Sequence, residues 1–342
     1  MSNRLRNFFF IFGFAAILVM VVLFDITWSE VLMMLRRAGI WFPVILLLWL
    51  VIYIVNAWAW TVIIRDRNNG SVSFLLIFKL TLTGFALNYT TPFGLMGGEP
   101  YRILELSPYV GKPKAVSSVI LYVMMHIFSH FCLWLFAVVL YVLMHFIAPL
   151  NYHMNWLIAI ALTCLAAVFV FVCYLFMRGY RYGMIVRLVG FLVKIPFLKT
   201  KIGPFVEKYQ TKFALIDEQI SELHGVRKRT FWGSLSMEFA ARLLSCLEYW
   251  FIFAILMPGI SYWDAVIIMA FSSLFSNIMF FLPMQLGSKE GGLAIAAQGL
   301  SIPGSYGLFT ALVTRLREVV WTVLGLVLMK VGNTNNKRRS DD

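Results

Sequence analysis

Charged residues are scarce in this sequence of 342 residues, because Asp, Glu, Lys and Arg together make up 13% of it. An ordinary soluble domain has about 25% charged residues, whereas 61% of this chain is hydrophobic. The composition therefore excludes a soluble globular protein. The alternating apolar and polar pattern of a membrane β-barrel is also missing. Six apolar runs instead mostly reach the roughly 17–25 residues of a membrane-crossing helix. They are residues 8–24, 42–64, 115–146, 156–177, 231–257 and 305–330.

Cysteine is equally rare, and the four cysteines all lie inside apolar runs. The sequence has no Cys-x-x-Cys pair, no His-Glu-x-x-His motif, no nucleotide-binding glycine loop and no Ser-His-Asp order. It therefore predicts no disulfide framework, no metal site, no cofactor and no enzyme. His126 and His130 have a spacing that can hold a metal, but no acidic residue lies beside them. We interpret His126, Ser129 and His130 as a polar stripe that faces the protein interior.

Basic residues outnumber acidic ones by 29 to 16, and the excess is concentrated in one segment. Residues 178–229 contain eleven Lys or Arg and four acidic residues, so this segment should be cytoplasmic and form interfacial helices. Basic residues near both ends of the chain place both termini on the same side. We expect a multi-pass protein of the cytoplasmic membrane, with no nucleic-acid partner. Arg36 and Arg37 fall in the first outward loop, where an interfacial helix would accommodate them.

Two stretches rich in Gly and Pro, residues 74–107 and 262–301, do not fit single crossings. Because both termini and the basic segment are inside, each stretch must return to the face from which it entered. We predict two re-entrant helical hairpins, inserted from opposite faces, within a single domain of residues 1–342. Residues 42–146 then form one repeat and residues 230–330 form a second, inverted repeat.

The two breaks share a spacing that supports the duplication. Pro92 precedes Glu99 by seven positions, Pro283 precedes Glu290 by seven, and an Asn comes before each proline. Paired broken segments in two inverted halves indicate a transport site near the middle of the membrane. The alternative is that two Gly/Pro-rich loops resemble each other by chance.

A helix that starts at a hairpin tip directs unpaired N–H groups and the positive end of its dipole into the protein, which favours an anion. Cations near the tips would receive a lipid phosphate, and the glutamates would organise them or contact a positive headgroup. The alternative is that both glutamates only cap helix ends. The candidate substrate-binding residues are Asn88, Gly97, Gly98, Glu99, Arg102, Asn277, Gly287, Ser288, Lys289, Glu290, Arg315, Arg317 and Glu318.

Charges within the apolar runs cost about 2.5–3.5 kcal/mol each at a helix centre unless they are paired or hydrated. Glu238 and Arg242 fall on one helical face, so this pair can neutralise locally, and Arg315 can pair with Glu318 three positions on. Arg317 and Glu248 have no such local partner. We therefore expect Arg317 and Glu248 to line a path. Ser288 is expected to cap its helix.

Two motifs resemble the lysylphosphatidylglycerol synthetase transmembrane-region family of flippase-like membrane proteins. They are Gly97-Gly98-Glu99-Pro100-x-Arg102 within residues 88–106 and Leu286-Gly287-Ser288-Lys289-Glu290-Gly291 within residues 283–293. Members resemble the flippase half of the multiple peptide resistance factor, which moves aminoacylated phosphatidylglycerol outward. The resemblance implies that Glu99, Arg102 and Glu290 take part in translocation.

The chain departs from the resistance factor in two ways. Many relatives have an Arg where this chain has Lys289, and twelve residues (331–342) follow Lys330, so the aminoacyl-transfer domain is not expected. The resemblance implies flipping or scrambling of an anionic or aminoacylated phospholipid, or of an isoprenoid-phosphate lipid. The alternatives are a lipid-modifying intramembrane enzyme and a non-catalytic partner of a separate lipid synthase. Membrane lipids are the expected partners, and a homo-oligomer is compatible with the sequence.

Overall fold

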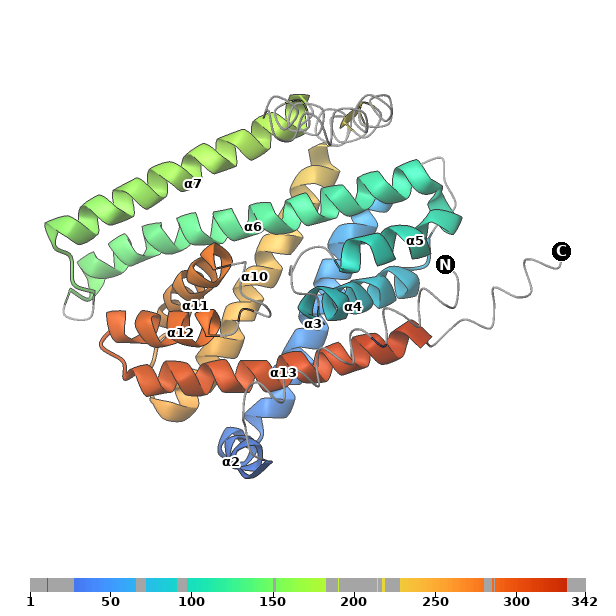
Figure 1. Cartoon of the computed structure of the whole chain (residues 1–342). Coiled ribbons are helices and arrows are strands. Elements are labelled where there is room, and N and C mark those ends of the chain that lie inside the picture. The colour runs from blue at the N-terminus through green and yellow to red at the C-terminus, as the bar shows by residue number, and fades with distance from the viewer. Residues whose placement is uncertain are drawn as a thin grey trace, which may run out of the picture.

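The structure is a computed structural model that describes residues 28–65, 72–90, 97–149, 152–182, 228–279 and 287–330, with positions 11, 190, 214, 217, 218 and 285. These residues contain helices and no strand, which confirms the predicted all-α class. The helices, shown in Figure 1, are α2 (Trp28–Ala38), α3 (Trp41–Ile64), α4 (Phe74–Thr90), α5 (Gly98–Val110), α6 (Lys112–Ile147), α7 (Trp156–Tyr182), α10 (Lys228–Leu256), α11 (Tyr262–Ile278), α12 (Ser288–Gly299) and α13 (Gly304–Lys330).

Four helices of the described residues are long and apolar enough to cross a membrane, namely α3, α6, α7 and α10. Each coincides with a predicted span. The helix α13 has 27 residues, enough to cross, but Arg315, Arg317 and Glu318 lie in its middle. The predicted span at 8–24 and the predicted interfacial helices at 178–229 lie almost entirely outside the described residues. The fold is that of a polytopic membrane protein.

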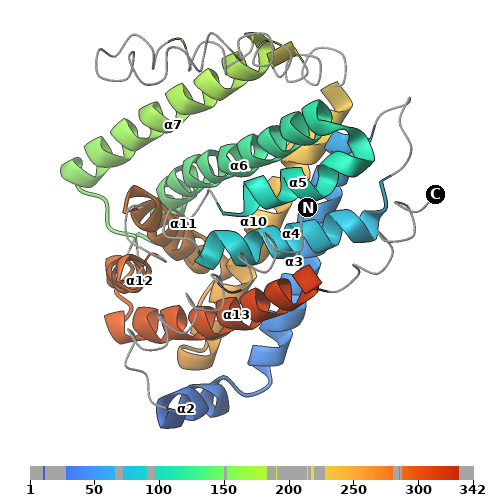
Figure 2. The same cartoon turned by 45° about the vertical axis from the view of Figure 1, so that its right-hand side comes forward.

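The two arginines that the sequence places in the first outward loop, Arg36 and Arg37, lie in a helix. Arg36 and Arg37 are in the last turn of α2 and are exposed. Leu32 and Met33 of the same helix are also exposed. Figure 2 shows α2 beside the start of α3, at the lower end of the molecule. The basic residues in its last turn and its exposed apolar side chains suit a helix that lies in a membrane interface.

The order long helix, two short helices, long helix occurs twice, in α3–α6 and again in α10–α13. The contacts α3–α4, α4–α5, α5–α6 and α3–α6 recur as α10–α11, α11–α12, α12–α13 and α10–α13. Between the units, α6 packs on α10 and α11, and α13 correspondingly packs on α3 and α4. Figures 1 and 2 show that α3 and α10 run in opposite directions, as do α6 and α13. An inverted repeat has this arrangement.

Each short-helix pair belongs to its own apolar core. One core gathers buried residues of α4, α5 and the first half of α6, and the other gathers those of α11, α12 and the second half of α6. The helices approach closely at glycines. A Cβ on Gly98 would overlap the carbonyl of Gly84, and one on Gly307 would overlap that of Leu293. Small residues allow this packing in membranes, where close van der Waals contact drives helix association.

Candidate functional site

Asn88, in the last turn of α4, connects α4 to the start of α5 across the break of the first hairpin. Its side-chain oxygen accepts a hydrogen bond from the backbone N–H of Gly98 at 2.7 Å, and its amide nitrogen donates to Oε1 of Glu99 at 2.9 Å. Oε2 of Glu99 is buried and has no hydrogen-bond partner within the described part of the chain. Gly97 is the N-cap residue of α5 and supplies no side-chain cap. The structure thus brings the four predicted residues of this tip together.

Arg102 is the buried cation of the first hairpin. Its Nη1 lies 3.5 Å from Oε1 of Glu99, as the spacing of three residues predicted. Its other nitrogens donate to two carbonyls of α4, and its guanidinium faces two aromatic rings. These partners are Leu80, Thr81, Trp60 and Tyr122. A Cβ on Gly84 would overlap this guanidinium, so the glycine makes room for the arginine beside α4.

The second hairpin presents both charges from the first turn of α12. Nζ of Lys289 lies 2.5 Å from Oε1 of Glu318, and Nε of Arg315 lies 3.0 Å from Oε1 of Glu290. The predicted pair of Arg315 and Glu318 also forms, at 3.6 Å. All four side chains are at most 15% exposed. The start of α12 is therefore fixed to the middle of α13 by ion pairs.

Two predicted residues of this hairpin lie elsewhere or act differently. Ser288 does not cap α12: the N-cap is Gly287, whose φ of +76° favours glycine, and Ser288 donates to the carbonyl of Gln285 at 3.0 Å. Asn277 is exposed and donates to the carbonyl of Ser273 in its own helix. Asn277 thus lacks the role of Asn88, and it stands six residues before its proline rather than four.

Arg315 connects the two hairpins. Besides Glu290, its guanidinium donates to the carbonyl of Gln285 at 2.9 Å and to the hydroxyl of Tyr89 at 3.3 Å. Tyr89 belongs to α4 of the first hairpin, whereas Gln285 and Glu290 belong to the second. Neither Tyr89 nor Gln285 was among the residues predicted from the sequence. The one feature of the sequence that could have indicated a role for Tyr89 is its position next to Asn88.

Arg317 and Glu248, which have no partner at local helical spacing, form a buried ion pair with each other, and their place along a path stays a prediction. Nε and Nη2 of Arg317 donate to the two oxygens of Glu248 at 3.0 and 2.9 Å, and the side chains are 2% and 0% exposed. The indole N–H of Trp49 donates to the same carboxylate at 2.8 Å, and its ring lies 3.7 Å from the guanidinium carbon. The pair joins α13 to α10, so no local spacing could reveal it.

The six ionised side chains around α12 and α13 form what we term the central charged cluster: Glu248, Lys289, Glu290, Arg315, Arg317 and Glu318. Three cations face three carboxylates, so the cluster has no net charge. Ion pairing offsets the cost of placing each charge within a membrane domain. Oε2 of Glu290 and Nη1 of Arg317 remain buried without a hydrogen-bond partner in the described part of the chain, so each retains hydrogen-bonding capacity.

A second polar group lies between α6 and α10, and we term it the His126 cluster: His126, Ser129, His130, Glu238 and Arg242. Nδ1 of His126 lies 2.8 Å from Oε2 of Glu238, and its Nε2 lies 2.5 Å from Nη2 of Arg242. Nε of Arg242 donates to the Ser129 hydroxyl at 3.3 Å. The predicted polar stripe of α6 therefore faces the protein. The imidazole stands between Glu238 and Arg242, which were expected to pair directly.

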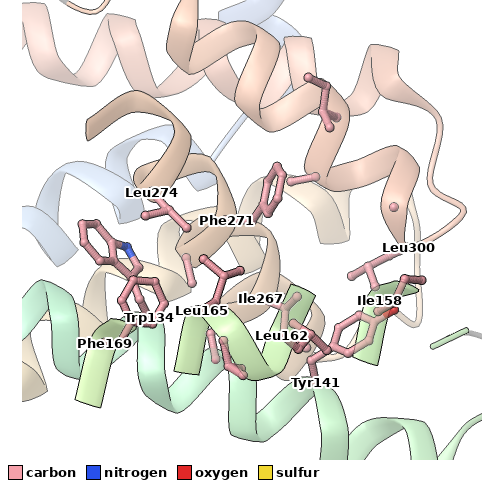
Figure 3. Close-up of a pocket in the computed structure, with 16 residues that line it drawn as sticks. Trp134, Tyr141, Ile158, Leu162, Leu165, Phe169, Ile267, Phe271, Leu274 and Leu300 are labelled. Atoms are coloured by element: carbon pink, nitrogen blue, oxygen red, sulfur yellow. The ribbon is translucent and has the colours of Figure 1, made fainter. Parts of the chain in front are cut away.

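An apolar pocket of about 320 Å³ lies between α6, α7, α11 and α12. Figure 3 shows Trp134 and Tyr141 of α6 on one side of it, with Phe169 of α7 and Phe271 of α11 among the other lining residues. Ile295 and Ala296 of α12 also line it. They follow Glu290 by five and six positions, which is about 8–9 Å along a helix. The charged start of α12 and this pocket are thus successive parts of one short helix.

The fold and the site define a polytopic α-helical membrane protein with two helical hairpins around a buried, neutral charged cluster. A model of the family described as lysylphosphatidylglycerol synthase TM region matches residues 10–325. The chain belongs to this family, and the resemblance noted in the sequence is confirmed. Comparison with curated proteins and with solved structures found no match. Family membership associates the protein with the handling of lipids related to lysylphosphatidylglycerol.

Proposed function

We propose that the protein flips or scrambles a phosphate-bearing lipid across the cytoplasmic membrane, without making or breaking covalent bonds. The substrate class is an anionic or aminoacylated phospholipid, or an isoprenoid-phosphate lipid. The observation that supports this most directly is the position of Arg315, which bonds to Tyr89 of the first hairpin and Glu290 of the second. One cation that contacts both hairpins is suited to hold an anionic headgroup while either hairpin moves.

The neutral state of the central charged cluster explains how a charged headgroup would enter. A phosphate would replace Glu290 as the partner of Arg315, because a guanidinium binds phosphate through two parallel hydrogen bonds. The carboxylate released by this exchange would be available to the amino group of an aminoacylated headgroup. With an aminoacylated headgroup the released Glu290 gains a new cationic partner, so entry leaves no unpaired carboxylate in the membrane, which would be costly.

The apolar pocket of Figure 3 supports the lipid part of the proposal. One of its walls is α7, and large apolar side chains elsewhere on that helix, such as Trp156, Leu157 and Phe171, are exposed. Apolar surface of this kind is covered by lipid in a membrane. A lipid whose phosphate contacts Arg315 beside Glu290 would have a hydrocarbon chain near Ile295 and Ala296. Both termini on the cytoplasmic side complete the proposed orientation.

The test is lipid exchange in liposomes that contain the purified protein and fluorescent phospholipids of different headgroups. Loss of fluorescence to an impermeant quencher reports transfer between leaflets. We expect Glu99→Gln and Glu290→Gln to reduce protein-dependent exchange, because each removes the charge that partners Arg102 or Arg315. Glu105→Gln is the matched control, since Glu105 lies on α5 outside both clusters. If both variants fold normally and exchange lipid at the wild-type rate, the proposal is wrong.

A further inference from the structure

The His126 cluster lies between α6 and α10, apart from the central charged cluster, and it holds a deeply buried carboxylate. Glu238 is fully buried, and its Oε1 has no hydrogen-bond partner among the described residues. Within the described part of the chain, its other oxygen forms one hydrogen bond, to His126. A buried carboxylate normally has its oxygens satisfied, because leaving one unpaired is costly. An oxygen in this state is well placed to receive a proton.

The hydrogen bonds fix the protonation of His126. An arginine donates and never accepts, so Nε2 of His126 must accept from Nη2 of Arg242. A neutral imidazole has one N–H, and here it must be on Nδ1, which donates to Oε2 of Glu238. The cluster therefore consists of a neutral imidazole between a carboxylate and a guanidinium. A proton can reach Nε2 only after Arg242 turns away.

The histidines provide a route to the buried carboxylate. The side chain of His126 is 33% exposed, whereas that of Glu238 is 1% exposed. His130 lies one turn further along α6 with its ring 5.7 Å from that of His126, and its buried Nδ1 has no hydrogen-bond partner in the described part of the chain. A proton that binds Nε2 of His126 releases the Nδ1 proton to Glu238. The imidazole is again neutral, and Glu238 has become a carboxylic acid.

The surrounding charges determine what this proton changes. From α5, Arg102 interacts electrostatically with Glu238 and His126, and from α6 Tyr122 interacts with Glu238, Arg102 and Glu99. Among the residues that the structure describes, the other helices packed on α10 add no further charge here. The α3 span has no charged residue, Asp264 of α11 caps the far end of its helix, and Arg317 of α13 is paired with Glu248. Glu99, Arg102, Glu238 and Arg242 together carry no net charge, so protonation of Glu238 leaves one positive charge.

The repeat gives independent support for a special role of His126. His126 follows Glu99 by 27 positions, and Arg317 follows Glu290 by the same 27 positions. The two residues thus occupy equivalent places on α6 and α13. Their pairs differ, because His126 pairs with a glutamate of the other repeat and Arg317 pairs with a glutamate of its own repeat. The second repeat has a permanent cation at this place, whereas the first has a side chain that can lose or gain its charge.

We propose that Glu238 takes up one proton through His126 when a lipid phosphate binds beside Arg102 and Arg242, so that proton and anion enter together. This adds a phosphate position at the first hairpin to the one proposed at Arg315, and it depends on the proposed function. The positive charge left by protonation of Glu238 is then balanced by the phosphate. Because the lipid-bound state holds one more proton than the free state, lipid affinity falls as the pH rises, by up to tenfold per pH unit.

The quantity to measure is the uptake of protons when lipid binds. Short-chain phosphatidylglycerol is added to the purified protein in weakly buffered detergent solution with a pH indicator, and binding is measured in parallel. The wild type should take up about one proton per lipid bound, and its lipid affinity should fall with rising pH. Glu238→Gln, which mimics the neutral acid, should bind lipid without proton uptake and with little pH dependence. Glu105→Gln should behave as the wild type does.

Two results would overturn the proposal. One is wild-type lipid binding without proton uptake and without pH dependence, a measurement that does not rely on any variant folding correctly. The other is proton uptake by Glu238→Gln equal to that of the wild type. If the protein exchanges lipid in liposomes but takes up no proton on binding it, the coupling to a proton is contradicted and the proposed transport function is not. If binding is linked to a proton but no lipid is exchanged, the proposed transport function is contradicted and the proton site is not.

Discussion

Replacing Arg315 with Gln is expected to reduce lipid exchange to about the level of protein-free liposomes. The substitution removes the cation that contacts Glu290, Gln285 and Tyr89. A hydrogen bond to a charged group contributes about 1.5–3 kcal/mol, which corresponds to about ten- to hundredfold in affinity for a phosphate. The measurement is the initial rate of fluorescence loss to an impermeant quencher, at equal amounts of reconstituted protein.

Two further variants distinguish the effect of losing the charge from the effects of side-chain geometry and of folding. Arg315→Lys keeps the charge but loses the planar fork, so it should retain partial exchange. Arg36→Gln removes an exposed cation of α2 and should exchange lipid at the wild-type rate. Wild-type exchange by a well-folded Arg315→Gln would show that the contact between the hairpins has no part in transport.

Replacing Arg317 with Leu should destabilise the fold more than any other single substitution considered. Removal of one partner leaves Glu248 buried and ionised, with the indole of Trp49 as its one hydrogen-bond donor among the described side chains. Breaking a buried ion pair in this way costs about 3–5 kcal/mol. Denaturant unfolding in detergent, followed by tryptophan fluorescence, measures the change in free energy.

The double variant Glu248→Gln with Arg317→Leu removes both charges and should recover most of the loss, because a neutral polar side chain costs far less to bury than a charge. Arg36→Leu, at an exposed position, should change stability by at most about 0.5 kcal/mol. A single Arg317→Leu substitution as harmless as Arg36→Leu would mean that the pair contributes little, and that Glu248 is protonated or hydrated when alone.

The helices of this fold were largely predictable because a helix that crosses a membrane needs a certain length and an apolar composition. The four apolar helices coincide with predicted spans, and Pro and Gly indicated the breaks between α4 and α5 and between α11 and α12. Within the site, contacts between near neighbours were predictable. Arg102 pairs with Glu99 and Arg315 approaches Glu318 at the expected helical spacing.

Contacts between distant helices were not predictable, because sequence spacing does not determine how two helices align. Arg317 and Glu248 are 69 positions apart, and Tyr89 and Arg315 are 226 apart. His126 had no visible partner in sequence, although Glu238 and Arg242 now flank it. Ser288 was expected to be a cap from its residue type, but the positive φ places Gly287 there instead. Apart from the cap of α12, these errors concern packing between elements, and not the elements themselves.

The central claim, movement of a phosphate-bearing lipid between leaflets, is tested most directly with the wild-type protein. Its liposomes should be loaded with one of two fluorescent lipids that have the same chains, one with a phosphate headgroup and one with an uncharged headgroup without phosphate. The account predicts that the protein accelerates exchange of the phosphate lipid well above that of protein-free liposomes and accelerates the other lipid much less. Equal acceleration of both lipids, or none of either, would contradict it.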